Sequence, residues 1–266
     1  MNIFTYKDYI KCIHTLRLNA AFKLAEESSK YYIDKEDKKD TRIIKKILNR
    51  RKEMEIFINE FLDLNEKIES KNLTKYNNEY ICNKYRIDKN KLIYKVKNKE
   101  IFFLVEEISE LDNIVLYEIL NYCISIMQEW NLSNKIRCEN KYPIIIPIII
   151  YTGDKKRILI ENKEDRVRIE NNIFKNYNIL LNYNLININK IHVEKLLASK
   201  SLITYGILIK KSKNEIELKK NLNLIIDNIE NDFSLDYLRV LTNYLSSEDR
   251  AYIIDIIKSK KDRNYK

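Results

Sequence analysis

Apolar residues recur with different periods along the chain, and these periods predict where helices and strands lie. Residues 91–97 alternate between two sides of an extended chain, which predicts a strand. A charged turn is expected at residues 97–100, and the continuously apolar run 101–105 predicts a second strand, buried on both faces. Between Ile119 and Trp130, apolar residues return at helical spacing, and Asp112 is placed to cap that helix. Two strands followed by a helix therefore form the predicted centre of the fold.

Helical patterns precede this centre. Residues 1–37 carry an imperfect apolar face and predict one long helix, followed by a solvated charge run at residues 35–40. Two further apolar stripes, at residues 43–48 and 54–62, predict a pair of helices. The basic joint at residues 50–52 permits contact with a phosphate backbone, but a solvated helix end is the preferred interpretation.

The second half of the chain adds strands and then a long helical region. The run 142–153 holds both prolines, which argue against a strand paired on both sides along its whole length, yet residues 148–150 are three isoleucines. Gly153 supplies a turn in Thr-Gly-Asp and answers a backbone requirement. Residues 177–189 alternate well enough for another strand, and the pattern from residue 192 is helical, with a helix start at residues 246–248.

These elements predict an α/β fold. The expected sheet is small and mixed, is built from residues around 77–107, 144–151 and 177–189, and is flanked by helices. The expected organisation is an N-terminal helical extension (1–37), an α/β core (38–190), a helical C-terminal subdomain (191–260) and a disordered tail (261–266).

Composition places the chain among soluble globular proteins, with 45% hydrophobic and 33% charged residues. The longest apolar run, residues 144–151, is far shorter than the roughly 20 residues that cross a bilayer, and the N-terminus lacks the uninterrupted apolar core of a secretory signal. We therefore expect a cytoplasmic protein without a membrane partner. The net charge of +10 permits a nucleic-acid partner. Because Lys, Asn, Ile and Tyr are abundant and Gly and Pro are rare, an AT-rich genome accounts for part of this charge.

The cysteines and histidines do not indicate a metal site or a disulfide framework. The four cysteines are far apart and form no CxxC pair, and the chain has two histidines. Buried free thiols are expected instead, at Cys12, Cys82, Cys123 and Cys138.

Two acids at the end of the second predicted strand are the main candidates for chemistry. Glu106 and Glu107 follow the apolar run directly, where a buried strand leaves the core. Glu106 and Ile108 share one face because side chains repeat every two residues, and Glu107 points to the other face. An acid in this position suits a metal site, and the alternative is an acid that only caps the sheet edge.

The order of the segments resembles the Rpn family of recombination-promoting nucleases, which are also catalogued as transposases of mobile elements. The matching segments are KKILNRRKEMEIFINEFL, KLIYKVK, IFFLVEEIS and YPIIIPIIIYTG, and they lie between about Asp40 and Gly153. The resemblance implies a PD-(D/E)XK nuclease-like fold and magnesium-dependent cleavage of DNA. Other positions that match the family are Asp112, Tyr117, Tyr122, Pro143, Pro147, Tyr151 and Gly153.

Aligned with that family, the chain keeps one acid and loses the rest of the motif. Glu106 matches the strand-borne acid, but the family's Asp falls on Lys91 and its Gln or Lys falls on Ile108. The usual basic residue of the next helix falls on Glu118, and the usual tryptophan falls on Arg157. A lysine beside Glu106 repels a cation and favours an ion pair in its place. We therefore expect a catalytically impaired member that acts on or binds DNA.

Two alternatives remain open, and they leave open whether the chain is an enzyme. In the first, the protein is an active endonuclease in which Glu106 binds Mg²⁺ together with substitute ligands from Asp88, Glu53 or Glu107. Glu53 is interpreted first as an acid on a helix surface. In the second, it is a non-enzymatic homologue that needs no cofactor and binds a homologous protein or itself.

Overall fold

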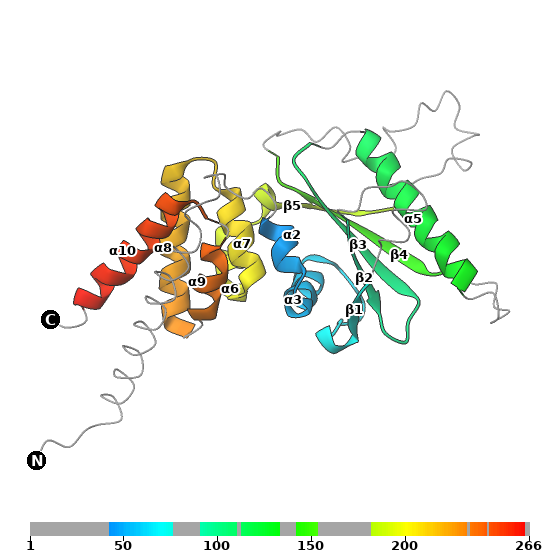
Figure 1. Ribbon diagram of the computed structural model, residues 1–266, viewed down its shortest axis with the longest axis horizontal. Helices are drawn as coiled ribbons and strands as arrows, with labels where there is room; N and C mark the ends of the chain where they lie inside the picture. Colours follow the sequence, from blue (N-terminus) through cyan, green and yellow to red (C-terminus); the bar gives the residue numbers. More distant parts are fainter. Residues whose placement is uncertain are drawn as a thin grey trace, which may run out of the picture. The chain divides into compact units, whose positions relative to one another are not determined.

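The computed structural model describes residues 43–76, 91–110, 113–133, 142–153, 182–232, 235–243 and 245–263. The chain divides into two compact units, a sheet unit of residues 48–191 and a helical unit of residues 1–47 and 192–266 (Figure 1). Several predictions fall outside the described residues, namely those for the helix of residues 1–37, Cys12, Cys82, Asp88, Asp112, Cys138 and Arg157.

The sheet unit is built on a five-stranded mixed sheet, which confirms the predicted α/β class. Its strands lie in chain order, and the first two pairings are antiparallel whereas the last two are parallel. The bounds are β1 (Leu73–Lys75), β2 (Leu92–Val96), β3 (Ile101–Ile108), β4 (Ile144–Tyr151) and β5 (Asn184–Asn187). The predicted turn between β2 and β3 is present, and Asn98 adopts φ 58° there.

Strand β3 is longer than its apolar run. It continues to Ile108, so Glu106 and Glu107 lie within the strand, and both are half-buried after four buried residues, as expected where the strand leaves the core. The parallel ladder to β4 explains the extension, because Glu106 is in register with Ile149 and Ile108 with Tyr151. A neighbouring strand therefore fixes the backbone of both acids.

Strand β4 accommodates a proline because its two edges differ. The N–H groups of Ile144 and Thr152 donate to the carbonyl oxygens of Glu100 and Ile108 at 2.7 and 2.8 Å. The backbone N–H groups of the even-numbered residues of β4 therefore point toward β3. The backbone nitrogen of Pro147, an odd-numbered residue, therefore points toward the β5 side, where no hydrogen is needed because pairing with β5 begins only at Ile148. Among the described strands, β4 is central only in its second half, as the prolines predict.

Gly153 allows the end of β4 to approach β3 closely. A Cβ atom added at Gly153 would lie 2.0 Å from the carbonyl oxygen of Ser109. The Gly153 carbonyl also accepts a 2.7 Å hydrogen bond from the Asn189 side chain, in the 3-10 helix η5 (Ile188–Lys190). The backbone requirement at Gly153 is thus the close approach of two chains.

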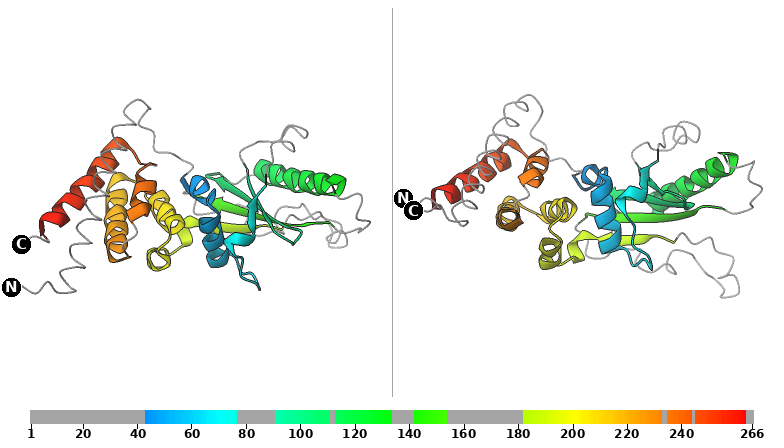
Figure 2. Two further views of the ribbon diagram at one scale, coloured as in Figure 1. Left: turned by 60° about the horizontal axis from the view of Figure 1, so that its bottom comes forward. Right: turned by 90° about the horizontal axis from the view of Figure 1, so that it is seen from below.

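One helix covers each face of the sheet, as Figure 2 shows. Helix α5 (Asn113–Ser133) packs its apolar side on one face, in a core of Ile93, Phe102, Leu104, Ile119, Tyr122, Cys123, Ile126 and Ile149. Helix α3 (Arg51–Phe61) lies on the other face. Tyr94 points to that face, because its neighbour Ile93 belongs to the α5 core and side chains alternate along a strand. The Tyr94 hydroxyl lies 3.0 and 2.8 Å from the carbonyl oxygens of Leu48 and Asn49, just before α3. Burial raises the pKa of Tyr94 to about 12.

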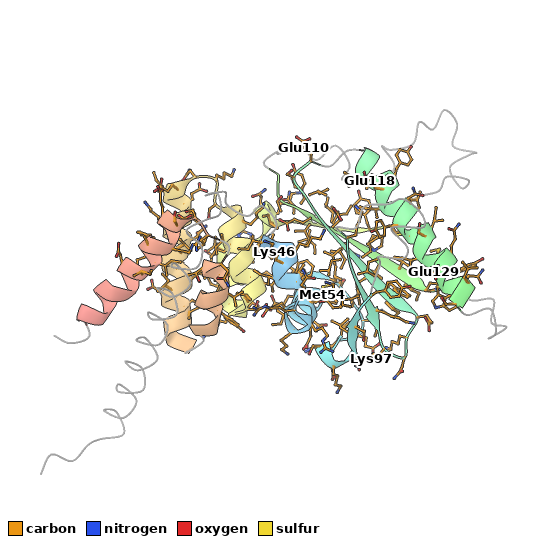
Figure 3. The ribbon with its side chains drawn as sticks, in the orientation of Figure 1. Lys46, Met54, Lys97, Glu110, Glu118 and Glu129 are labelled. Carbon is orange, nitrogen blue, oxygen red and sulfur yellow. The ribbon has the colours of Figure 1, made fainter. Side chains whose placement is uncertain are left out.

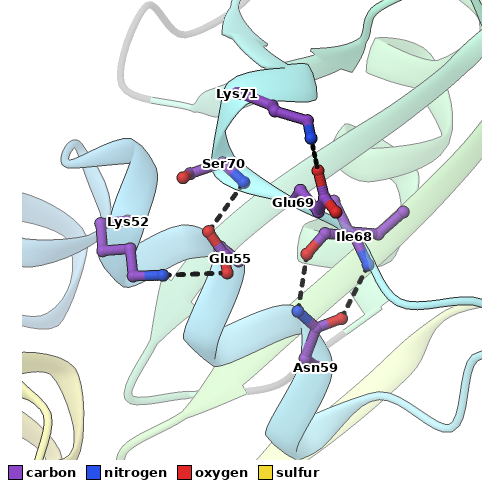
Figure 4. A network of polar contacts seen from close by, with 7 residues as sticks. All are labelled: Lys52, Glu55, Asn59, Ile68, Glu69, Ser70 and Lys71. Carbon is purple, nitrogen blue, oxygen red and sulfur yellow. Dashed lines mark hydrogen bonds and ion pairs between the residues drawn. The ribbon is translucent and has the colours of Figure 1, made fainter.

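A polar clamp fixes the chain between α3 and β1 (Figure 4). The Asn59 side chain donates to the Ile68 carbonyl at 2.7 Å and accepts from the Ile68 N–H at 2.9 Å. Glu55 accepts from the Ser70 N–H at 2.7 Å, at the start of the 3-10 helix η1 (Ser70–Asn72), and from Lys52 at 3.0 Å. Burial acts to raise the pKa of Glu55, but these hydrogen bonds outweigh it and lower that pKa below its usual value. Helix α3 and its following loop therefore form one fixed layer.

The helical unit surrounds a helix that is buried along most of its length. Its described helices are α2 (Ile43–Leu48, whose last residue belongs to the sheet unit), α6 (Val193–Ser199), α7 (Leu202–Lys211), α8 (Glu215–Asp232), α9 (Leu235–Thr242) and α10 (Ser247–Arg263). Residues 202–209 of α7 are all buried, and Ser201 and Thr204 form a capping box at its start. The Ser246 hydroxyl caps α10 by accepting from the Asp249 N–H at 3.1 Å, which confirms the predicted helix start. Helix α10 continues to Arg263, three residues into the predicted tail.

No helix in the described part of the chain is both long and apolar enough to span a membrane.

Candidate functional site

The register of β2 and β3 brings Lys91 next to Glu106. Leu92 is paired with Val105, so the next antiparallel step places Lys91 opposite Glu106. Both side chains point to the α5 face, because Ile93 and Leu104, two residues away on each strand, belong to the α5 core. The fold therefore places the two motif positions side by side, as the resemblance implies.

The contact between these two residues is close and largely shielded from water. The Lys91 Nζ atom lies 3.2 Å from Glu106 Oε2, and the side chains are 2% and 13% exposed. Helix α5 supplies two further neighbours of the ammonium group. Glu118 Oε2 lies 3.6 Å away, and the Tyr122 ring centroid lies 5.7 Å away. Figure 3 labels Glu118 near the start of α5, which follows the end of β3.

The Lys91 ammonium group neutralises the charge of the Glu106 carboxylate, but this pair of residues does not fit a hard cation. Magnesium requires oxygen ligands, and here a buried ammonium group contacts the retained carboxylate. In the ranges that the structure describes, no group of three or more His, Cys, Asp or Glu side chains could hold a metal ion. The α5 face thus carries a closed ion pair covered by a tyrosine ring.

Ile108 completes this face as an apolar residue. It lies at the end of β3, is half-buried, and packs against the α5 core. An alkyl side chain there can neither orient a water molecule nor donate a hydrogen bond to phosphate.

The opposite face of β3 carries a different pair of acids. Glu107 points to the side that α3 covers and is half-buried. Glu53 on α3 is only 4% exposed, so the interpretation of Glu53 as a helix-surface acid is wrong. The helical period explains its burial, because Glu53 lies one turn before Phe57 on the stripe that packs inward.

Comparison with known families decides the assignment of the chain. The model of the family described as "Putative transposase, YhgA-like" matches residues 38–238, which is more than half of the chain. The chain belongs to this family. No curated protein and no solved structure matches the sequence significantly.

Membership of the YhgA-like family confirms the predicted resemblance, and the structure shows where the other matching positions lie. Tyr117 is 71% exposed on α5, whereas Tyr122 on the same helix is buried under Lys91. The matching residues of the β4 segment are all buried, namely Pro143, Pro147, Tyr151 and Gly153. Tyr151 and Gly153 therefore serve the packing of the sheet end that holds Glu106, because Tyr151 is in register with Ile108, whereas Pro147 is level with Leu104 in the middle of β3.

Sequence reasoning did not identify two of the residues around Lys91 as its partners. In the sequence, Glu118 stands out only as a departure from a basic family position, and Tyr122 only as a position that matches the family. Their spacing of four residues, which places both on one side of a helix, is the signal that could have linked them. The structure gives both residues the same neighbour, the Lys91 ammonium group.

Proposed function

We propose that this YhgA-like protein binds DNA without cleaving it. The observation that carries the proposal is the 3.2 Å contact between Lys91 Nζ and Glu106 Oε2. In this proposal the Lys91 ammonium group occupies the place of the metal ion. The fold is then retained, but metal-dependent cleavage of DNA is lost. The family description as transposases and the net charge of +10 support DNA as the ligand.

The absence of cleavage is tested with supercoiled plasmid. Wild-type protein is incubated with Mg²⁺ or with Mn²⁺, and nicked and linear products are separated on a gel. We expect no product from the wild type or from Glu106→Gln. Nicking by the wild type that Glu106→Gln abolishes would overturn the proposal.

DNA binding is tested separately by fluorescence anisotropy with a labelled duplex. We expect binding that survives EDTA and Glu106→Ala, and that weakens as salt rises, since the logarithm of the affinity falls by about 0.9 per phosphate neutralised for each decade of salt. If no salt-dependent affinity is found, the proposal of DNA as the ligand is overturned, and the result points to a protein partner instead.

The blocking role of Lys91 has its own readout. In Lys91→Asp, a carboxylate replaces the ammonium group beside Glu106, so the variant should bind Mn²⁺ more tightly than the wild type, as measured by calorimetry. Lys95→Asp is the matched control, because Lys95 is the next lysine on the same side of β2 but pairs with Glu100. If the wild type binds Mn²⁺ as tightly as Lys91→Asp, Lys91 does not block a metal site.

A second candidate function is an endonuclease that uses the other face of the sheet. It is favoured by the burial of Glu53, 4% exposed, on the helix that covers the face to which Glu107 points. Glu53 and Glu107 would hold the cation there, and the cation would polarise a phosphate oxygen. In the plasmid assay, Glu53→Gln and Glu107→Gln would then abolish nicking, whereas Glu106→Gln would leave it intact.

A further inference from the structure

Helix α5 has an outer side that exposes several apolar residues. Its inner side is buried against the sheet, but Tyr117, Ile124 and Leu132 are 71%, 43% and 43% exposed. They belong to one exposed stripe along the helix, which we call the α5 outer stripe. It consists of Tyr117, Asn121, Ile124, Gln128, Asn131 and Leu132.

The α5 outer stripe carries no charge, although the protein is strongly basic. Helix α5 contains no Lys or Arg, in a chain with 49 of them, whereas every other described α-helix contains at least one. A surface without cations is a poor match for the DNA backbone. Depletion of charge together with exposed aromatic and aliphatic side chains is typical of the centre of a protein–protein interface.

The spacing of the apolar residues makes the α5 outer stripe complementary to a second, antiparallel copy of itself. Tyr117 lies seven residues before Ile124, and Leu132 lies eight residues after it. Two antiparallel copies of α5 related by a twofold axis near Ile124 would therefore place each Tyr117 against the Leu132 of the other copy. Glu118 would then face Asn131, so the pairing brings no two like charges together. Self-complementarity of this kind is what an isologous dimer requires.

We propose that the α5 outer stripe is the interface of a homodimer, with a second copy of this chain as its occupant. The apolar residues of the stripe span about 22 Å at 1.5 Å per residue. A contact of one helix with another is smaller than the roughly 800 Å² per partner of a standard interface, so a dissociation constant in the micromolar range is expected. The proposal is independent of DNA binding and of metal.

The test is sedimentation velocity of the full chain, without DNA or metal, across a dilution series around micromolar protein. The wild type should convert from monomer to dimer, and Ile124→Lys should raise the dissociation constant at least tenfold, since the lysine charge would be buried at the twofold axis. Ile216→Lys is the matched control, because Ile216 is an apolar residue on α8 that is 82% exposed. Circular dichroism melting shows whether each variant remains folded.

A second measurement fixes the geometry. Ile124→Cys should form an intermolecular disulfide under mild oxidation, because the twofold axis brings the two copies of this position together, whereas Ile216→Cys should not. Wild-type protein gives the background from its four cysteines. A wild type that stays monomeric at all concentrations, or a dimer that Ile124→Lys and Ile216→Lys affect equally, would overturn the proposal.

Discussion

Two adjacent glutamates of β3 lie on opposite faces of the sheet and have different surroundings. On the α5 face, Glu106 lies opposite Lys91, and α5 adds the carboxylate of Glu118 to the same ammonium group. On the α3 face, Glu107 points toward the side covered by a helix that contributes a buried acid, Glu53. The role of an acid in this fold therefore depends on the strand opposite and on the helix above it. Its neighbours in sequence do not decide that role.

The largest expected effect comes from breaking the ion pair on the α5 face. Lys91→Met leaves the Glu106 carboxylate largely buried without its ammonium partner, and this should lower the free energy of unfolding by about 3–5 kcal/mol. The double variant Lys91→Met/Glu106→Leu should recover much of that loss, because it removes both charges together. Urea denaturation of both variants gives the values.

Lys95→Met is the control for Lys91→Met. The Lys95–Glu100 pair lies on the same face, but its side chains are 34% and 40% exposed. An exposed pair contributes only about 0–1 kcal/mol. If Lys91→Met lowers the free energy of unfolding no more than Lys95→Met does, the Lys91–Glu106 pair is not shielded from water in the way that its geometry indicates.

This difference between the faces could be foreseen only in part. Alternation along residues 91–97 and the parity of Glu106 and Glu107 predicted which side chains share a face, and the family alignment predicted the Lys91–Glu106 contact. The burial of Glu53 was not predicted, because an acid beside Met54 in a charged stretch resembles a solvated helix end until the helix is packed on the sheet. Likewise, the length of β3 depends on its ladder to β4, which is a long-range pairing that the local apolar run does not contain.

The α3 face is tested by the tyrosine that joins α3 to β2. Tyr94→Phe removes the hydroxyl that lies 3.0 and 2.8 Å from the carbonyl oxygens of Leu48 and Asn49. The free energy of unfolding should fall by about 1–2 kcal/mol, because a buried hydrogen bond is lost and its acceptors remain. Tyr142→Phe, at a position that is 69% exposed, should change the stability by less than about 0.5 kcal/mol. Equal effects from the two variants would show that the α3 layer is not held through Tyr94.

A smaller effect is expected from Glu55, which joins α3 to its loop, and this effect depends on pH. The pKa of Glu55 lies below its usual value of 4.5 in the folded state. Its contribution to stability is therefore present above about pH 4.5 and is lost as the pH falls through the folded-state pKa. Glu55→Gln should lower the free energy of unfolding by about 1 kcal/mol at pH 7 and by progressively less below pH 4.5, as measured by urea denaturation at several pH values. Asp63→Asn, an exposed change of the same charge, should show no such dependence. A cost that stays constant down to pH 3 would contradict the assignment.

The smallest expected signal comes from Cys123, which reports on the packing of α5 over the ion pair. The thiol is 4% exposed and adjoins Tyr122 in sequence, and burial raises its pKa to about 12. Because the thiolate is the reactive form, Cys123 should resist iodoacetamide at pH 8 in the folded protein and react in urea. Peptide mass spectrometry distinguishes it from the other three cysteines, and Ile216→Cys provides an exposed thiol for comparison, at a position that is 82% exposed. If Cys123 reacts in folded protein as fast as the cysteine introduced at position 216, α5 does not stay closed over the α5 face. Lys91 and Glu106 would then be open to water and ions, and the distinction between the two faces of the sheet would be lost.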